Sequence, residues 1–288
     1  MNFQKTKGVN KSMVTECRDE LEIIVTVKQV PDTTDVEVGE DGNLIREGVD
    51  SKMNPYDMYA LETALQLKEE YGGHVTVLSM GPPQAEEVIR EAFMMGADEG
   101  YLLTDIEFAG ADTWATAYTL SQGLEVIGKR DAYDLIICGE ESTDGDTAQV
   151  GPQIGEALGI PHVAYVSDLL YEDTDTQKIT IEKEMGDTIE VVEFPYPGLI
   201  TVTKAVNQPR LPSFRLKLEN KNKEITHLTF SDLPDNDSTN FGLDGSPTQV
   251  EKVFPPDDDI EQVIWKDESG EKMADRVYYE LKKELKMV

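Results

Sequence analysis

Residues 21–27, Leu-Glu-Ile-Ile-Val-Thr-Val, decide the fold class, because they form an apolar, β-branched run that is bounded by Pro31-Asp32. A run of this kind is typical of a strand buried on both faces of a parallel sheet. Working outward, a helix is expected to begin at Asn54-Pro55, with Asn as its cap and Pro at its first position. Apolar residues then recur every three or four positions until Gly72-Gly73, which ends the helix.

The alternation of strands and helices continues along the chain. Further strands are expected at residues 75–80, 101–103, 135–138 and 162–166, and further helices at residues 83–95, 112–127 and 149–158. Strands that alternate with helices in this way predict an α/β fold with a doubly wound parallel sheet and helices on both of its faces.

The chain changes character after Ser167. Residues 178–184 and 188–194 alternate around Met185-Gly186-Asp187, which predicts a β-hairpin, and residues 199–203 predict one more strand. Beyond Pro209 the apolar residues are scattered, and a last helix is expected at about 274–285. We therefore expect three parts: a flexible N-terminal extension (1–20), an α/β domain (21–207) and a C-terminal arm (208–288) that lies on another surface.

The composition excludes several classes of partner. The chain has 26 Lys and Arg against 57 Asp and Glu, a net charge of −31, so nucleic acid and anionic membrane surfaces are disfavoured. The charge leaves open a well-solvated protein and one that docks to a basic partner. No apolar stretch is long enough for a membrane span, and the first twenty residues lack a secretory signal. We expect a cytoplasmic protein.

Groups for metal binding or covalent catalysis are scarce. The two cysteines, Cys17 and Cys138, lie far apart and form no C-x-x-C spacing, which argues against zinc or iron–sulfur ligation. The three histidines are scattered, and no serine lies in G-x-S-x-G. Acidic pairs at 140–141 and 144–146 could hold Mg²⁺, but a solvated loop is the preferred interpretation. We expect neither catalytic residues nor a metal.

The loop that follows the strand at 135–138 is the strongest candidate site. In open parallel sheets, ligands bind at the carboxyl ends of the strands. Gly145 can adopt a positive φ or admit a ligand closely, and backbone N–H groups at the start of the next helix attract anions. The loop can thus cradle a phosphate, or it is an ordinary Asp-capped helix start. Asp144 and Asp146 would repel a phosphate and would instead bind ribose hydroxyls or cap the loop. Neither G-x-G-x-x-G nor G-x-x-x-x-G-K-[ST] is present.

Five short motifs follow one another along the chain. They are Val-Lys-Gln-Val-Pro-Asp-Thr at 27–33, Leu-Ile-Arg-Glu-Gly at 44–48, Asn-Pro-Tyr-Asp at 54–57, Ser-Met-Gly-Pro-Pro-Gln-Ala at 79–85 and Asp-Gly-Asp-Thr-Ala-Gln-Val-Gly-Pro at 144–152. Their order and spacing resemble the beta (small) subunit family of electron transfer flavoproteins. The resemblance covers about residues 22 to 250.

The resemblance implies a heterodimer with an alpha subunit that holds an electron-carrying FAD. The beta subunit would bind a second adenine nucleotide, which is AMP in simple members and FAD, reduced by NADH, in the electron-bifurcating members of anaerobes. The Asp-Gly-Asp-Thr form of the loop is more similar to the bifurcating members, so FAD is favoured and AMP is the alternative. An unrelated nucleotide-binding regulator that forms a homodimer is a further alternative.

The resemblance also assigns residues. The adenosine side of the nucleotide would contact Val27, Asn54, Ser79, Met80 and Gly81, with Asp112 and Thr113 lining the same cleft. The phosphate cradle would comprise Asp144, Gly145, Asp146, Thr147, Ala148, Gln149 and Val150, and Gly139 would also bind the cofactor. Thr33 and Tyr56 would lie toward the flavin of the alpha subunit. Residues 208–214 look like a recognition loop, in which Leu211 and Phe214 contact an acyl-CoA dehydrogenase or another flavin-linked dehydrogenase.

Two departures from the family pattern bear on these assignments. Glu140-Glu141-Ser142 replaces the more usual Arg-Gln-Ala type of sequence beside the nucleotide loop. The basic run that often follows the recognition loop is diluted here by Glu and Asn at 217–223. The choice of dehydrogenase therefore stays open.

Overall fold

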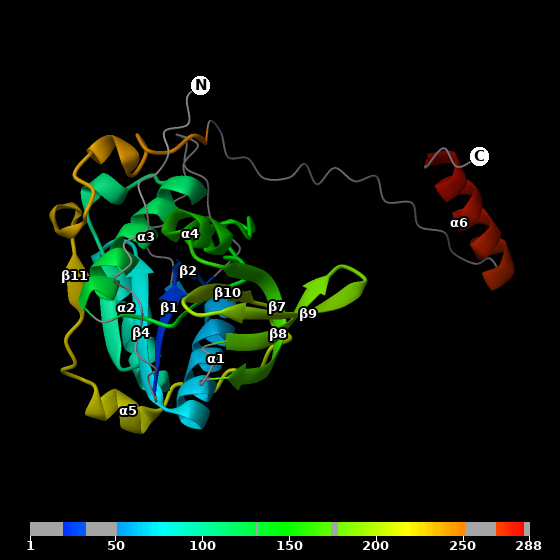
Figure 1. The fold of residues 1–288 in the computed structure, drawn as a ribbon. Coiled ribbons are helices and arrows are strands. Elements are labelled where there is room, and N and C mark those ends of the chain that lie inside the picture. The colour runs from blue at the N-terminus through cyan, green and yellow to red at the C-terminus, as the bar shows by residue number, and fades with distance from the viewer. Residues whose placement is uncertain (1–19, 33–50, 131, 174–177, 251–268, 285–288) are drawn as a thin grey trace. The chain divides into compact units, whose positions relative to one another are not determined.

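The structure is a computed structural model that describes residues 20–32, 51–130, 132–173, 178–250 and 269–284 (Figure 1). The chain divides into two units, the first formed by residues 1–37 and 44–251 and the second by 38–43 and 252–288. The expected N-terminal extension, apart from Glu20, lies outside the described residues, as does Thr33.

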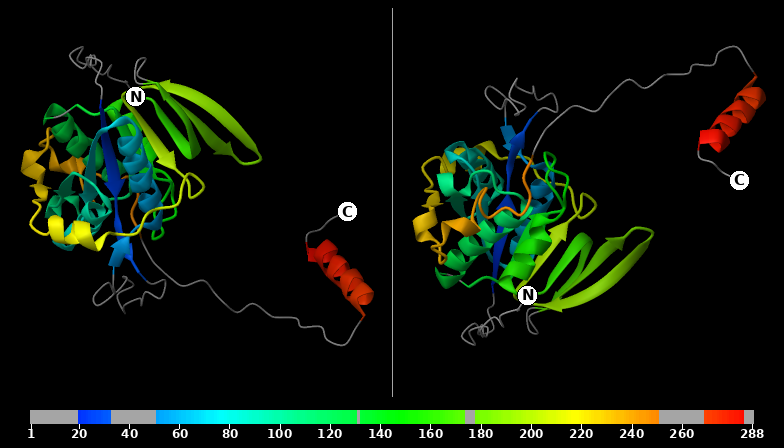
Figure 2. Two further views of the ribbon diagram at one scale, coloured as in Figure 1. Left: turned by 90° about the horizontal axis from the view of Figure 1, so that it is seen from below. Right: turned by 90° about the horizontal axis from the view of Figure 1, so that it is seen from above.

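Unit 1 is built on a nine-stranded sheet in the order β11-β5-β4-β1-β6-β10-β7-β8-β9, counted over the described residues. The parallel strands are β1 (Leu21–Val27), β4 (Gly73–Met80), β5 (Glu99–Leu103), β6 (Leu135–Gly139), β7 (His162–Asp173), β10 (Gly198–Val202) and β11 (Thr226–Leu228). The expected doubly wound α/β fold is confirmed. The expected hairpin is confirmed too, since β8 (Lys178–Met185) and β9 (Thr188–Pro195) pair antiparallel and extend the sheet beyond β7. Figure 2 shows this hairpin projecting from the body of unit 1.

Helices cover both faces of the sheet. One apolar cluster joins the sheet to α1 (Pro55–Tyr71) and α2 (Glu86–Met95), and the other joins it to α3 (Thr113–Arg130) and α4 (Val150–Leu158). Along β1, Ile23 and Val25 belong to the first cluster and Ile24 to the second, as alternation along a strand requires. The apolar run of residues 21–27 is therefore buried on both sides, as its sequence predicts.

The order in which the chain adds strands to the sheet reverses at β1. The chain passes from β1 through α1 to β4 on one side and later returns to β6 on the other side. The loops that follow β1 and β6 therefore leave the carboxyl edge of the sheet in opposite directions. Such a switch point is where open parallel sheets bind ligands.

Several elements lack a clear sequence signal. A short antiparallel pair, β2 (Gln29–Pro31) with β3 (Ser51–Met53), frames the entry to α1. Two further elements, α5 (Phe214–Glu219) and β11, belong to unit 1. After β11, Phe241 is 1% exposed and packs against Phe108, Tyr118 and Phe230, so the segment up to residue 250 is part of the body of unit 1.

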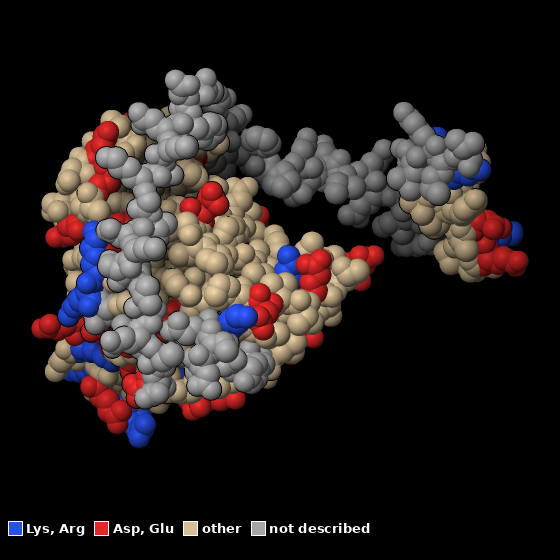
Figure 3. Space-filling view, viewed as in Figure 1, with Lys and Arg blue, Asp and Glu red and all other residues tan. Residues whose placement is uncertain are grey.

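Unit 2 contributes one described helix, α6 (Gly270–Glu284). This helix begins and ends close to the predicted positions. Among the described residues, no helix combines the length and the hydropathy that crossing a membrane requires. On the face of the molecule seen in Figure 3, acidic and basic side chains are interspersed around a broad area of uncharged residues.

Candidate functional site

Two loops meet at the carboxyl edge of β1 and β6, and an ion pair joins them. Lys28 follows β1, and its Nζ lies 2.6 Å from Asp144 Oδ1 and 2.8 Å from Asp144 Oδ2. Burial alone would raise the pKa of Asp144, but the hydrogen bond and the charge of Lys28 outweigh burial and hold that pKa below its ordinary value. Because the Lys28 side chain is about half exposed, this pair orders the loop more than it stabilises the fold.

Asn54 holds the cradle loop, which we define as residues 140–150, in place. Its side-chain amide is buried and donates to the carbonyl of Glu141 (2.8 Å) and to Asp57 Oδ1 (3.0 Å), and its oxygen accepts from the N–H of Thr143 (3.2 Å). Asn54 is the N-cap residue of α1, as expected, but its side chain makes no capping hydrogen bond to that helix.

Asp57 is a buried carboxyl group directly behind the loops. It accepts hydrogen bonds from Asn54 and from the backbone N–H of Lys28, the latter at 2.7 Å. Burial raises the pKa of Asp57 to about 7, although these hydrogen bonds act to lower it. The group is therefore poised between its neutral and ionised forms near neutral pH.

Gly139 ends β6 where that strand passes the start of α1. A Cβ at this position would press on the Asp57 carboxylate and lie 2.7 Å from the Tyr56 carbonyl carbon. No side chain fits there without a backbone shift. Gly139 therefore sets how closely the two parts of the site approach each other.

The cradle loop has an unusual backbone. Positive φ angles occur at Asp146 (47°) and Ala148 (51°), whereas Gly145, where the sequence suggests a positive φ or a close approach, has no positive φ. Left-handed residues interspersed in such a turn direct successive N–H groups to one side, which is the geometry of an anion-binding nest. Within the described residues, no hydrogen bond engages the N–H groups of Thr147, Ala148, Gln149 or Val150. The loop thus offers free donors at the start of α4.

The first turn of α3 adjoins the same loop. Thr113 Oγ1 donates to Gln149 Oε1 at 3.2 Å, which links the starts of the two helices. Asp112 caps α3 by accepting from the N–H of Ala115, and its second oxygen accepts from the N–H and the hydroxyl of Thr248. No local pattern in the sequence signals that Thr248 reaches this edge.

The carboxyl end of β4 supplies Ser79, Met80 and Gly81. Ser79 lies beside Val27 in the parallel register, is fully buried, and its hydroxyl has no partner among the described residues. A buried hydroxyl without a partner is unfavourable unless a ligand completes it. This orphan group and the free N–H groups of the cradle loop fit an adenine nucleotide that spans the edge.

Tyr56 stands at the first turn of α1. Burial and a hydrogen bond to Glu141 raise its pKa, and Glu140 and Asp146 add negative charge nearby. The fold therefore brings most of the expected residues to one edge of the sheet. The sequence analysis does not identify Lys28 as the partner of Asp144, although Lys28 lies within one of the five motifs.

Leu211 and Phe214 lie away from this edge. They belong to the segment around α5, which is tied to the C-terminal end of α2, and Figure 1 shows α5 beyond the amino ends of β1 and β4. The candidate site and the expected recognition segment are therefore at opposite ends of unit 1.

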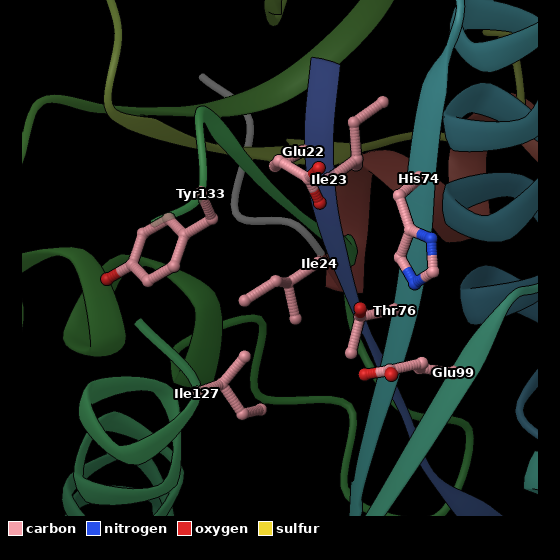
Figure 4. Close-up of a pocket in the computed structure, with 8 residues that line it drawn as sticks. All are labelled: Glu22, Ile23, Ile24, His74, Thr76, Glu99, Ile127 and Tyr133. Carbon is pink, nitrogen blue, oxygen red and sulfur yellow. The ribbon is translucent and has the colours of Figure 1, made fainter. Parts of the chain in front are cut away.

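A cavity of about 170 Å³ also lies at the amino ends of β1, β4 and β5 (Figure 4). Its lining includes Glu22, His74, Thr76 and Glu99. It is on the opposite edge from the cradle loop and plays no part in the candidate site. No group of three or more His, Cys, Asp or Glu in the described part of the chain could hold a metal ion.

The sequence of the chain matches a known class of redox proteins. The model of the electron transfer flavoprotein domain matches residues 41–233, more than half of the chain. The chain belongs to the beta subunit family of the electron transfer flavoproteins.

Relatives are similar over most of their length. The electron transfer flavoprotein subunit beta of Thermoanaerobacterium thermosaccharolyticum is 48% identical over 239 residues, 82% of this chain and 88% of the relative. Subunit CarD of the caffeyl-CoA reductase–Etf complex of Acetobacterium woodii is 44% identical, over 82% of this chain and 88% of the relative. Protein FixA of Azorhizobium caulinodans is 39% identical, over 91% and 94%.

Proposed function

We propose that this chain holds an FAD at the carboxyl edge of its sheet and pairs with an alpha subunit that holds its own FAD. NADH would be the electron donor, and electrons would leave both to the alpha-subunit FAD and to a partner, as in flavin-based bifurcation. The partner would be an acyl-CoA dehydrogenase or another flavin-linked dehydrogenase. When bound, the flavin supplies the redox chemistry, since it accepts a hydride and releases electrons singly.

The residues of this chain bind and orient the cofactor. The free N–H groups from Thr147 to Val150 would hold the phosphates, helped by the dipole of α4. The Lys28–Asp144 pair and Asn54 would keep the cradle loop in shape. The Ser79 hydroxyl would gain a partner on the adenosine side.

The observation that carries the proposal is the set of free donors in the cradle loop. Four adjacent N–H groups and the Thr147 hydroxyl suit a diphosphate, which needs more donors than one phosphate. The relation to CarD supports bifurcation, because that protein belongs to a reductase–Etf complex. The second candidate is a structural AMP, whose single phosphate the same loop could hold.

The test is the cofactor content of the purified heterodimer, released by acid and separated by chromatography. Two FAD and no AMP per heterodimer is the expected result. One FAD and one AMP would replace the proposal with the structural-nucleotide alternative, and a single FAD without AMP would refute both.

A matched pair of variants locates the site. Thr147→Val removes a hydroxyl donor from the cradle loop, and it should lower the content of the second nucleotide. Thr143→Val removes a hydroxyl of an exposed residue that makes no side-chain hydrogen bond within the described residues. It should leave the content unchanged.

A further inference from the structure

Three large apolar side chains project from the docking segment, which we define as residues 207–223. Leu211 is 85% exposed, Phe214 73% and Leu218 62%. Phe214 and Leu218 are four residues apart on α5 and therefore share a helix face. Single exposed apolar residues are ordinary, but three within eight residues form a patch of the kind that marks an interaction site.

The N-terminal end of the docking segment is fixed to α1. Asn207 Nδ2 donates to the Tyr59 carbonyl (3.1 Å) and to Thr63 Oγ1 (2.8 Å). Arg210 then binds Glu62 through its backbone N–H (3.1 Å), its Nε (2.7 Å) and one terminal nitrogen (3.0 Å). The segment thus has both a side-chain and a backbone attachment just before Leu211.

Arg210 also reaches a second carboxylate. Its terminal nitrogens lie 2.6 Å and 3.2 Å from the two oxygens of Glu69, about two helix turns beyond Glu62. Glu62 is buried, with a side-chain exposure of 5%, so its charge requires a fixed partner. A planar guanidinium can serve two carboxylates at once, which a lysine ammonium cannot do with the same geometry.

The rest of the docking segment is fixed to α2. The Ser213 N–H donates to the Met94 carbonyl (2.8 Å), and Asn220 Nδ2 donates to the Phe93 carbonyl (3.0 Å). Lys223 Nζ donates to the Ala97 carbonyl and lies 4.7 Å from the centre of the Phe93 ring. The three apolar side chains therefore project from a frame that is attached before, within and after them.

Basic residues surround the apolar patch. Between residues 210 and 223 there are five cations and one acid, in a chain whose net charge is −31. Arg215, Lys217 and Lys221 among them are exposed. A surface complementary to this face would be an apolar pocket with an acidic rim on another protein.

We propose that Arg210 is a positioning residue, which holds Leu211, Phe214 and Leu218 outward as a preformed docking face for the acidic-rimmed apolar pocket of a partner dehydrogenase. The inference rests on the proposed function, because it takes this segment as the docking site. It adds Leu218 to the face and assigns the fixed geometry to the Arg210–Glu62–Glu69 contacts. A face that is already ordered avoids the entropic cost of ordering it on binding.

The experiment uses the complete heterodimer and, as the probe, a purified acyl-CoA dehydrogenase of the same organism. The KM for the heterodimer and the kcat of electron transfer are measured at low and at high salt. Arg210→Gln should raise KM roughly tenfold at both salt concentrations and leave kcat and cofactor content unchanged, because it disorders a non-polar contact. Arg210→Lys should not restore KM. Leu218→Ala should raise KM in the same direction.

Arg215→Gln is the matched control. It removes the same charge from the same segment, but Arg215 is exposed and its one ion pair within the described residues, with Glu219, has a 3.7 Å separation. Its effect on KM should be small and should vanish at high salt, because only long-range charge is lost.

Loss of folding is controlled by a second variant. Arg210→Gln leaves Glu62 buried without its cation, so the double variant Arg210→Gln with Glu62→Gln is measured as well, and the same rise in KM is expected. If both variants keep the wild-type KM while Phe214→Ala raises it, the positioning role is refuted and the docking site stands. If Phe214→Ala leaves KM unchanged, or the heterodimer reduces no dehydrogenase, the docking proposal itself is refuted.

Discussion

Asp57 shows how a single buried group links the candidate site to pH. Its carboxyl group is buried behind the cradle loop, and its pKa rises from an ordinary value of 3.8 to about 7 in the folded chain. Between these two values the folded state binds more protons than the unfolded state. The free energy of unfolding therefore falls as pH rises from about 4 to about 7, and it becomes independent of this group above that range.

This sign gives the first prediction. The free energy of unfolding of the wild-type chain, minus that of Asp57→Asn, should decrease between pH 4.5 and pH 7 and level off above pH 8. Urea unfolding at a series of pH values measures both quantities. A difference that stays constant over the whole range would show that Asp57 is already ionised in the folded chain at pH 4.5.

Single residues also show the limits of sequence analysis. Asn54 before Pro55 predicts a helix start, which is correct. The Asn54 side chain, however, forms hydrogen bonds with the backbone of Glu141 and Thr143, more than eighty residues away. No pattern local to residue 54 encodes that contact. The same holds for Lys28 and Asp144, which approach only because β1 and β6 are neighbours in the sheet.

At the scale of elements, Gly139 at the end of β6 and Gly145 in the cradle loop differ sharply in their surroundings. A Cβ at Gly139 would meet the start of α1 at less than 3 Å, whereas a Cβ at Gly145 would meet only Ser142 Oγ, at 3.4 Å. Gly139→Ala should therefore destabilise the chain by about 1–3 kcal/mol, as overpacking does. Gly145→Ala should change stability by no more than about 0.5 kcal/mol.

Urea unfolding of both variants at one pH checks this second prediction. Equal losses of stability would contradict the close approach of β6 and α1 at Gly139. If Gly145→Ala keeps its stability but binds less of the second nucleotide, the small size of Gly145 serves the ligand and not the fold.

Element positions follow well from the sequence, but their order in the sheet does not. Apolar periodicity locates α1, α3, α4 and the hairpin, with help from Gly, Pro or a capping Asp at their boundaries, because these signals are local. Periodicity cannot show that β10 lies between β6 and β7. The three residues of β11 are too few for any period, and they form a strand only because the edge of β5 is available.

At the scale of the whole molecule, unit 2 contributes one described helix, α6. On α6, Met273, Val277 and Leu281 recur every four residues and form one apolar face, of which Val277 is 42% and Leu281 52% exposed. The two core clusters of unit 1, over the described residues, are built from residues 21–241. An apolar face of this kind is typical of a helix that packs on another surface.

The third prediction concerns a truncation after residue 251. The shortened chain should keep its thermal midpoint within about 2 °C, because the clusters that stabilise unit 1 are intact. Its affinity for the alpha subunit should fall by at least about tenfold, since the apolar face is lost. Calorimetry and titration calorimetry measure the two effects.

The control for the truncation is the full-length double variant Val277→Asp with Leu281→Asp. It keeps the length and the helix but replaces two apolar groups by charges, and it should lose as much affinity as the truncated chain. Unchanged affinity in both chains would mean that unit 2 takes no part in the pairing, and a large drop in the thermal midpoint would mean that unit 1 depends on it.

The position of β10 also governs how the chain can fold during synthesis. β10 lies between β6 and β7 in the sheet, although the ribosome makes it after both strands and after the hairpin. Until residue 202 has left the ribosome, β6 and β7 each expose a row of unpaired N–H and C=O groups along one edge. Open edges of this kind pair readily with other chains. The unfinished chain is therefore more prone to aggregate than the completed protein, and slowing its translation before β10 would lengthen the period of exposure.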